Sequence, residues 1–272
     1  MKYETSHNLT LPKLGFGTAR VGGRLLPDRS QDQYYLSALR SALELGYIHF
    51  DTAEFYSFGH SEELIGRAIR ETGMKRESLF ITTKVWPTHL RYKNVLRACE
   101  NSLRRLSTDY IDQYLIHWLN PFITLKDTFR ALNQLVKESK VKHIGVSNFN
   151  LNLLKQSQAL SESPITTDQV PYSLLHRPYV KNGVLEYCQQ NNILLTAYTP
   201  VDHGHIHANK TLQSIASAHQ ATPYQIALAW LVAQARVIAI PRSFKPLHQK
   251  ENLDAVNIEL SKSEMDQLDQ MG

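Results

Sequence analysis

The chain has 272 residues, and its 30 Lys and Arg against 25 Asp and Glu leave a formal net charge of +5 at pH 7. This length is long for an average domain and typical of an α/β barrel of about 250 residues. The small basic excess is spread along the chain and predicts no nucleic-acid partner. The two cysteines stand far apart and no apolar run approaches about 18 residues, so neither a disulfide framework nor a membrane span is expected.

Short apolar runs alternate with segments of helical periodicity along the whole chain. The predicted strands cover residues 13–17, 48–52, 79–85, 111–118, 143–149, 165–170, 192–199 and 237–241. The predicted helices cover residues 31–45, 61–72, 92–106, 125–139, 151–160, 181–190, 210–219, 223–234, 248–255 and 261–271. The last of these begins with a serine followed three residues later by a glutamate, which is the pattern of a capping box.

Eight strand–helix units and additional C-terminal helices predict a single-domain (β/α)₈ TIM barrel over residues 1–272. Several strands are nearly continuous apolar runs, as expected when both faces of a parallel sheet are buried. No Gly-x-Gly-x-x-Gly follows a strand, which argues against a Rossmann domain. Residues 3–16 are predicted to form a hairpin that closes the floor of the barrel.

Four residues with ionisable side chains stand at or just past the ends of predicted strands: Asp51, Tyr56, Lys84 and His117. The carboxyl ends of parallel barrel strands meet on one face, so these side chains are predicted to share a cleft. A tyrosine keeps its proton at neutral pH and can give it to a carbonyl oxygen. A nearby ammonium such as Lys84 would lower the pKa of that tyrosine by stabilising the phenolate.

The other two residues complete a general-acid site for carbonyl compounds. Asp51 can pair with Lys84 and keep it charged, and His117 can donate a hydrogen bond that orients the carbonyl. No side chain can supply hydride, so a nicotinamide cofactor is required.

The segments that carry these residues resemble those of the aldo-keto reductases: FDTAEFY at 50–56, ITTKVW at 81–86, LIHW at 115–118 and GVSNF at 145–149. The resemblance runs from LGFGT near the N-terminus to IPRSFKPLHQKEN near the C-terminus. It implies a barrel enzyme that reduces aldehydes or ketones with NADPH, NADH being possible, and that uses Asp51, Tyr56, Lys84 and His117 as its catalytic residues.

The same resemblance implies roles in cofactor binding for a second set of residues. Ser147, Asn148 and Gln169 would hold the nicotinamide carboxamide, and Tyr198 would stack on the ring. Further contacts would come from Gly17, Thr18, Asp51 and Thr199. The adenosine end and its 2′-phosphate would be bound by Arg242, Ser243, Lys245, His248, Glu251 and Asn252. Position 248 departs from the pattern, since many NADPH-preferring members carry arginine where this chain has His248.

The substrate side departs further from the family pattern. Ala19 replaces a common aromatic residue, and the loop after His117 is short. The chain also lacks a long C-terminal loop of the kind that shapes specificity in mammalian members. These features predict an open, shallow pocket with Phe55, Trp86 and Trp118 as apolar walls, suited to small aldehydes, dicarbonyls or keto-sugars.

Two other functions remain open from the sequence. A nicotinamide-binding regulatory subunit, similar to the potassium-channel β subunits, would share the barrel and the four ionisable residues. A metal-dependent hydrolase would use the histidines of DHGHIH, namely His203, His205 and His207. A loop that offers backbone N–H groups to a pyrophosphate accounts better for this segment, and we expect no metal.

The expected partner is a small carbonyl compound, with neither nucleic acid nor membrane involved, and a monomer is expected. The N-terminus shows no basic region followed by an apolar stretch. Together with the scarcity of cysteine, this predicts a cytoplasmic protein.

Overall fold

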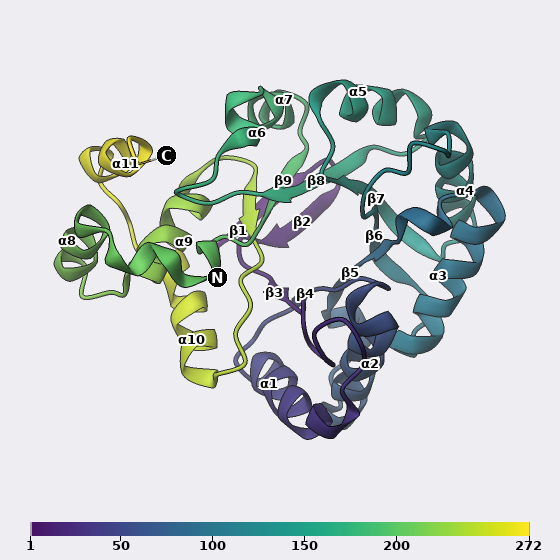
Figure 1. Cartoon of the computed structure of the whole chain (residues 1–272), viewed down its shortest axis with the longest axis horizontal. Helices are drawn as coiled ribbons and strands as arrows, with labels where there is room; N and C mark the ends of the chain where they lie inside the picture. The colour runs from purple at the N-terminus through teal and green to yellow at the C-terminus, as the bar shows by residue number, and fades with distance from the viewer. Residues whose placement is uncertain (1, 272) are drawn as a thin grey trace.

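The computed structural model describes residues 2–271, and for His203, His207 and Ala208 it describes the backbone only. Eight parallel strands form one sheet in the order β10-β9-β8-β7-β6-β5-β4-β3, and helices surround it (Figure 1). The strands of this sheet are β3 (Phe16–Gly17), β4 (His49–Asp51), β5 (Phe80–Val85), β6 (Ile111–Ile116), β7 (Val141–Ser147), β8 (Ile165–Pro171), β9 (Leu194–Tyr198) and β10 (Val237–Ala239).

The helices follow the strands in alternation, and α8 and α11 stand outside the ring that the others form around the sheet (Figure 1). Their bounds are α1 (Asp32–Glu44), α2 (His60–Thr72), α3 (Tyr92–Leu106), α4 (Leu125–Lys137), α5 (Leu151–Leu160), α6 (Pro178–Lys181), α7 (Val184–Gln190), α8 (Lys210–Ala218), α9 (Pro223–Ala233), α10 (Pro246–Asp254) and α11 (Lys262–Asp269). This arrangement confirms the predicted (β/α)₈ fold.

The first and last strands meet and close the sheet into a barrel. The segment that enters β3 forms a parallel bridge to β10 between Leu14 and Ala239. Gly15 N donates to Ala239 O at 2.9 Å, and Ala239 N donates to Lys13 O at 2.9 Å. Gly17 N continues the ladder with a 3.0 Å bond to Pro241 O. Closure places the end of β3 beside the end of β10, although these two strands are far apart in the sequence.

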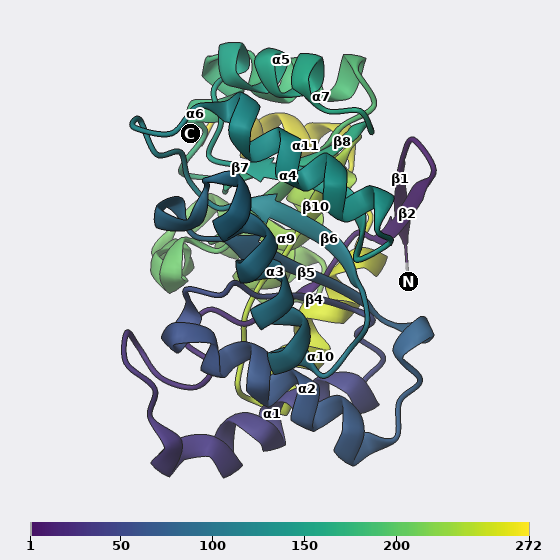
Figure 2. The ribbon, with the colours of Figure 1, turned by 90° about the vertical axis from the view of Figure 1, so that its right-hand side faces the viewer.

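An antiparallel hairpin covers the opposite end of the barrel, as predicted. It consists of β1 (Tyr3–Ser6) and β2 (Leu9–Pro12), and Figure 2 shows it at one end of the molecule. Leu9 and Leu11 pack against Phe80, Leu194 and Ile238, which lie near the starts of their strands. The hairpin therefore excludes water from the floor and leaves the carboxyl ends of the strands as the open face.

The residues at several helix ends explain where those helices begin. In α11 the capping box of Ser261 and Glu264 is formed, and α9 has a similar box at Thr222 with Pro223 in its first turn. The prediction of one helix over residues 181–190 is wrong. Gly183 has a φ of 81°, in the left-handed region, and it separates α6 from α7.

The strands are buried on both faces, as parallel barrel strands require. All six residues of β6 are buried, and the free cysteines Cys99 and Cys188 lie in the core between sheet and helices. Between residues 2 and 271 no helix has the length and apolar character needed to cross a bilayer.

Candidate active site

A buried ion pair lies at the carboxyl ends of β4 and β5. The Nζ atom of Lys84 donates to Oδ1 of Asp51 at 2.6 Å and to the backbone oxygen of Thr52 at 2.7 Å. The other carboxylate oxygen, Oδ2, accepts a 2.6 Å bond from Nε2 of Gln169 on β8. Burial by itself would lower the pKa of Lys84, but the Asp51 carboxylate raises it above the ordinary value. The ammonium therefore stays charged although solvent does not reach it.

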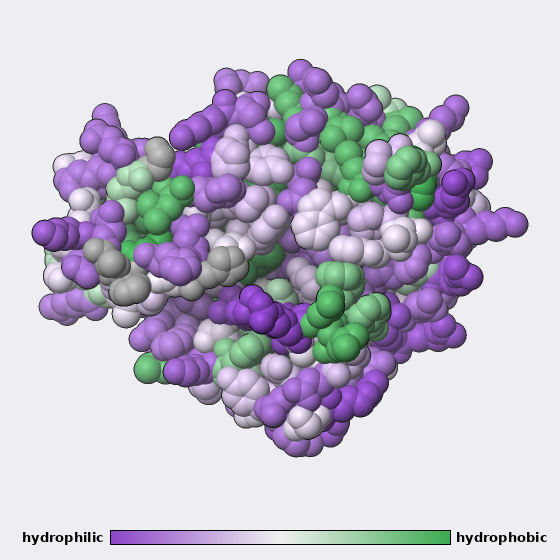
Figure 3. All heavy atoms as spheres, viewed as in Figure 1, coloured by the Kyte–Doolittle hydropathy of each residue, from purple (hydrophilic) through white to green (hydrophobic). Residues whose placement is uncertain are grey.

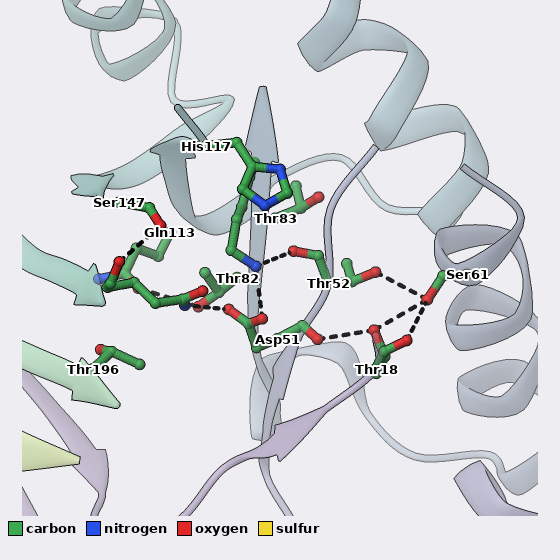
Figure 4. A network of polar contacts seen from close by, with 12 residues as sticks. Thr18, Asp51, Thr52, Ser61, Thr82, Thr83, Gln113, His117, Ser147 and Thr196 are labelled. Carbon is green, nitrogen blue, oxygen red and sulfur yellow. Dashed lines mark hydrogen bonds and ion pairs between the residues drawn. The ribbon is translucent and has the colours of Figure 1, made fainter. Parts of the chain in front are cut away.

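A chain of hydroxyl groups fixes the backbone around Asp51 (Figure 4). Thr52 Oγ1 donates to Ser61 Oγ at 3.1 Å, Ser61 Oγ donates to Thr18 Oγ1 at 3.0 Å, and Thr18 Oγ1 donates to Asp51 O at 2.8 Å. The chain joins the start of α2 to the ends of β3 and β4. Thr18 thus supports Asp51 from behind, and it is not among the residues that line the cleft described below.

Tyr56 stands in the loop that follows β4, at the start of a 3₁₀ turn (Tyr56–Gly59). It is half-buried, and its ring centroid lies 5.2 Å from Nζ of Lys84. Burial raises the pKa of Tyr56, whereas the Lys84 ammonium lowers it, and the net direction is upward. The Lys84 ammonium thus acts on the pKa of Tyr56 in the predicted direction, but the predicted net lowering is wrong because removal from water outweighs it. Tyr56 holds its proton at neutral pH.

His117 lies at the end of β6 and faces the same cleft. Burial, assisted by the charge of Lys84, lowers the pKa of His117 to about 2, so the imidazole is neutral. Its Nδ1 atom is buried and has no partner among the described residues. The ring meets Tyr56 edge to face, with the centroids 5.9 Å apart. A neutral imidazole carries one N–H and can donate a single hydrogen bond to a ligand.

A second polar group lines the wall formed by β7, β8 and β9. Ser147 Oγ donates to Gln169 O at 2.7 Å, and Nδ2 of Asn148 donates to Ser147 Oγ at 2.9 Å and to His117 O at 3.2 Å. The hydroxyl of Tyr198 donates to Oδ1 of Asn148 at 2.8 Å. Asn148 has a φ of 63°, a left-handed conformation that asparagine tolerates better than most residues. The two polar groups are joined through Gln169.

Most of these side chains line one cleft of about 690 Å³ on the open face of the barrel, whereas Lys84 and Asn148 are not among its lining residues. Figure 3 shows that face hollowed near its centre, with strongly hydrophilic side chains beside the hollow and an apolar patch next to them. The lining includes Gly17, Ala19, Arg20, Arg24, Asp51, Phe55, Tyr56, His117, Trp118, Ser147, Gln169, Tyr198, Thr199, Pro200, Val201, His205, Ile240, Pro241 and Arg242.

The far end of the cleft approaches the start of α10. Arg242 lines it and donates from Nη1 to Ala19 O at 2.7 Å. Ser243 Oγ accepts a 3.1 Å bond from Lys245 N, the residue that caps α10. Lys245 and His248 are exposed around the first turn of this helix. Backbone N–H groups at a helix start, together with nearby cations, form a site suited to a phosphate group.

Comparisons with known proteins agree with this geometry. The family model described as the aldo/keto reductase family matches residues 13–272. The chain belongs to the aldo-keto reductase family. It is 35% identical to the methylglyoxal reductase YeaE of Escherichia coli, over 97% of this chain and 92% of that protein.

Two solved aldo-keto reductases share the whole fold. A thermostable aldo-keto reductase crystallised with the inhibitor epalrestat is 46% identical, covers 100% of both chains and superposes with a TM-score of 0.97. An aldo-keto reductase from Klebsiella pneumoniae, in complex with NADP and acetate, is 35% identical over 98% of this chain and 93% of that one, with a TM-score of 0.89. The chain is thus an oxidoreductase of this family.

Within this aldo-keto reductase, the structure brings most of the predicted residues to one cleft and leaves some outside its lining. Trp86, predicted as an apolar wall, is not among the residues that line the cleft; its ring stacks on that of Phe55, with the centroids 3.7 Å apart, and so supports the wall. Phe55 and Trp118 line the cleft as predicted. Glu251 and Asn252 lie on α10, and the Asn252 side chain lies beside the Tyr47 hydroxyl.

The structure describes the DHGHIH segment only in part. His205 lines the cleft, while the side chains of His203 and His207 lie outside the described residues. Among the side chains that the structure describes, no group of three His, Cys, Asp or Glu is placed to hold a metal ion.

Three residues at or beside the cleft were not predicted from the sequence. Glu54 accepts a hydrogen bond from Trp86 N and contacts Nδ1 of His89 at 3.1 Å, so it joins the Tyr56 segment to the loop after β5. Arg20 and Arg24 line the mouth of the cleft. Both arginines follow β3, and the rule that function gathers after barrel strands would have found them.

Proposed function

We propose that this chain reduces small aldehydes and dicarbonyls to alcohols with NADPH, and that Tyr56 is the proton donor. The observation that carries the proposal is the charged Lys84, fully buried between Asp51 and Thr52 O, with its ammonium 5.2 Å from the ring centroid of Tyr56. A buried cation beneath a phenol at the inner end of a cleft favours formation of the phenolate once the proton has left.

The residues present fit an NADPH molecule. Ser147, Asn148 and Gln169 offer the donors and acceptors that a carboxamide needs, and Gln169 is itself fixed by Asp51. Gly17 lines the same cleft, and an added Cβ there would lie 2.7 Å from Ile240 O, so glycine lets the ends of β3 and β10 approach each other closely. Arg242 and the start of α10 stand at the other end, where a 2′-phosphate would be bound.

When bound, NADPH supplies the hydride that adds to the carbonyl carbon. Tyr56 transfers its proton to the carbonyl oxygen, so hydride and proton together convert the C=O group to CH–OH. The phenolate that remains on Tyr56 is stabilised by Lys84, and Asp51 keeps Lys84 charged and in place. His117, neutral because of its burial, donates one hydrogen bond that orients the carbonyl oxygen toward Tyr56.

The substrate side of the cleft supports small polar carbonyl compounds. Its apolar wall is formed by Phe55 and Trp118, while Ala19 contributes little bulk. The relative from Escherichia coli is named a methylglyoxal reductase, and methylglyoxal is a compact dicarbonyl of this kind.

Turnover by the purified protein tests the proposal. We expect the absorbance of NADPH to fall when methylglyoxal or another small aldehyde is added, and the alcohol to accumulate in equal amount. Tight NADPH binding without turnover of any aldehyde or dicarbonyl would contradict the proposal and favour a regulatory subunit.

A further inference from the structure

The mouth of the cleft carries an excess of positive charge that proton transfer does not use. The cleft is lined by three arginines, Arg20, Arg24 and Arg242. Among the described side chains of the lining, Asp51 alone is a carboxylate, and it is neutralised by Lys84. Guanidinium groups gathered in a cleft without carboxylate partners attract anionic ligands.

Two of the three arginines stand together. Arg20 lies close enough to Arg242 to contribute, after burial, to the lowered pKa of Arg242. Arg242 Nη1 also bonds to the backbone oxygen of Ala19, next to Arg20. The pair is therefore placed at the end of the cleft where the phosphates of the cofactor would lie. Arg24 needs a different explanation.

The loop that carries Arg24 is held in a defined shape. Asp28 N donates to Gly22 O at 2.7 Å and closes the loop at its base. Gly23 has a φ of 132°, and a Cβ at this position would collide with Leu26 O, so the turn requires glycine. The start of the Arg24 side chain is thus fixed by backbone contacts.

The same loop is tied to the catalytic tyrosine. Ser57 Oγ donates to Gly23 O at 3.0 Å, and Ser57 directly follows Tyr56. Arg24 directly follows Gly23, so its backbone lies beside the segment that holds the proton donor. Its side chain has no hydrogen-bond or ion-pair partner among the described residues and lines the cleft.

We propose that Arg24 binds a carboxylate carried by the substrate, and that oxo acids are therefore preferred over neutral carbonyl compounds of the same size. This inference rests on the proposed carbonyl reduction. The carbonyl end lies between Tyr56 and His117, the intervening hydrocarbon contacts Phe55 and Trp118, and the distal carboxylate pairs with the guanidinium of Arg24. A planar guanidinium can bind both carboxylate oxygens at once, which orients the substrate as well as attracting it.

The test compares matched acidic and neutral substrates in the wild-type protein and in Arg24→Gln. One pair is 4-oxobutanoate and butanal; a longer, rigid pair is 4-carboxybenzaldehyde and its methyl ester. We expect kcat/KM to be higher for the acid of at least one pair. In Arg24→Gln that value should fall about 10- to 100-fold, while the value for the neutral partner changes less than about threefold. Arg24→Lys should restore part of the loss.

Controls separate this role from others. Arg29→Gln removes a charge from the same segment outside the cleft, where Arg29 pairs with Glu63, and should leave both substrates unaffected. NADPH affinity, measured by fluorescence quenching, should be unchanged in Arg24→Gln. Equal losses for acid and neutral substrate, or a loss of NADPH affinity, would overturn the inference and assign Arg24 to the cofactor. Turnover of neutral aldehydes without any preference for acids would overturn it while leaving the proposed function intact.

Discussion

The Nζ atom of Lys84 lies 2.6 Å from Oδ1 of Asp51 at a place where both side chains are buried. Two charges that are taken out of water together are tolerated because each neutralises the other and both have further hydrogen bonds. Asp51 has Gln169 as its second partner, and Lys84 has Thr52 O. Loss of either partner would therefore leave the other charge buried without its counter-charge.

Replacing one partner of this pair should destabilise the protein. Asp51→Asn leaves a buried ammonium without its counter-charge, so the free energy of unfolding should fall by about 3–5 kcal/mol in urea denaturation. The double variant with Lys84→Met removes both charges and should recover part of that loss. A double variant no more stable than Asp51→Asn would contradict the account.

The pH dependence of reduction follows from the directions of two pKa shifts. The proposed mechanism needs protonated Tyr56, and burial raises the pKa of Tyr56 above its ordinary value of 10.0. His117, with a pKa lowered to about 2, stays neutral at every working pH. We expect kcat for reduction to be level from about pH 5 to about pH 9 and to fall only beyond that range. A loss of activity on the acid side near pH 6.5 would mean that His117 titrates in water-like surroundings.

Arg242 should set the preference between the two nicotinamide cofactors. Arg242→Ala removes a guanidinium from the proposed 2′-phosphate site and should weaken NADPH binding by about 10- to 100-fold, with little effect on NADH. Dissociation constants for both cofactors, from fluorescence titration, provide the measurement. Equal losses would show that Arg242 does not recognise the 2′-phosphate.

Asp168 offers a prediction about stability and pH. It is fully buried, and burial raises its pKa to about 8. The pKa of Asp168 is higher in the folded than in the unfolded state. Its favourable contribution to the free energy of unfolding is therefore complete below about pH 4 and is lost as the pH rises toward 8. Asp168→Asn cannot ionise, so its stability relative to wild type should rise between about pH 5 and about pH 8, at about 1.4 kcal/mol per pH unit. Urea denaturation at both pH values measures this difference, and a difference that does not change with pH would contradict it.

Much of this fold follows from short-range pattern. Apolar runs predicted every strand of the barrel, because parallel strands that are buried on both faces are nearly continuous apolar segments. The split at Gly183 was missed, since a left-handed glycine inside a helical pattern is chosen by tertiary packing as much as by local preference.

The site was predictable to a similar extent. The rule that strand ends share a face placed Asp51, Tyr56, Lys84 and His117 together. The bond between Gln169 and Asp51 spans 118 positions and depends on the register of distant strands, which no local pattern reveals. The stacking of Trp86 on Phe55 likewise depends on how loops from different strands pack.

The most direct test of the central claim is the comparison of Tyr56→Phe with the wild-type protein in NADPH-dependent reduction. The substitution removes only the hydroxyl group, so the ring still packs against His117. We expect kcat to fall about 10²- to 10⁴-fold while NADPH fluorescence quenching stays unchanged. Turnover at the wild-type rate in Tyr56→Phe would contradict the assignment of Tyr56 as the proton donor.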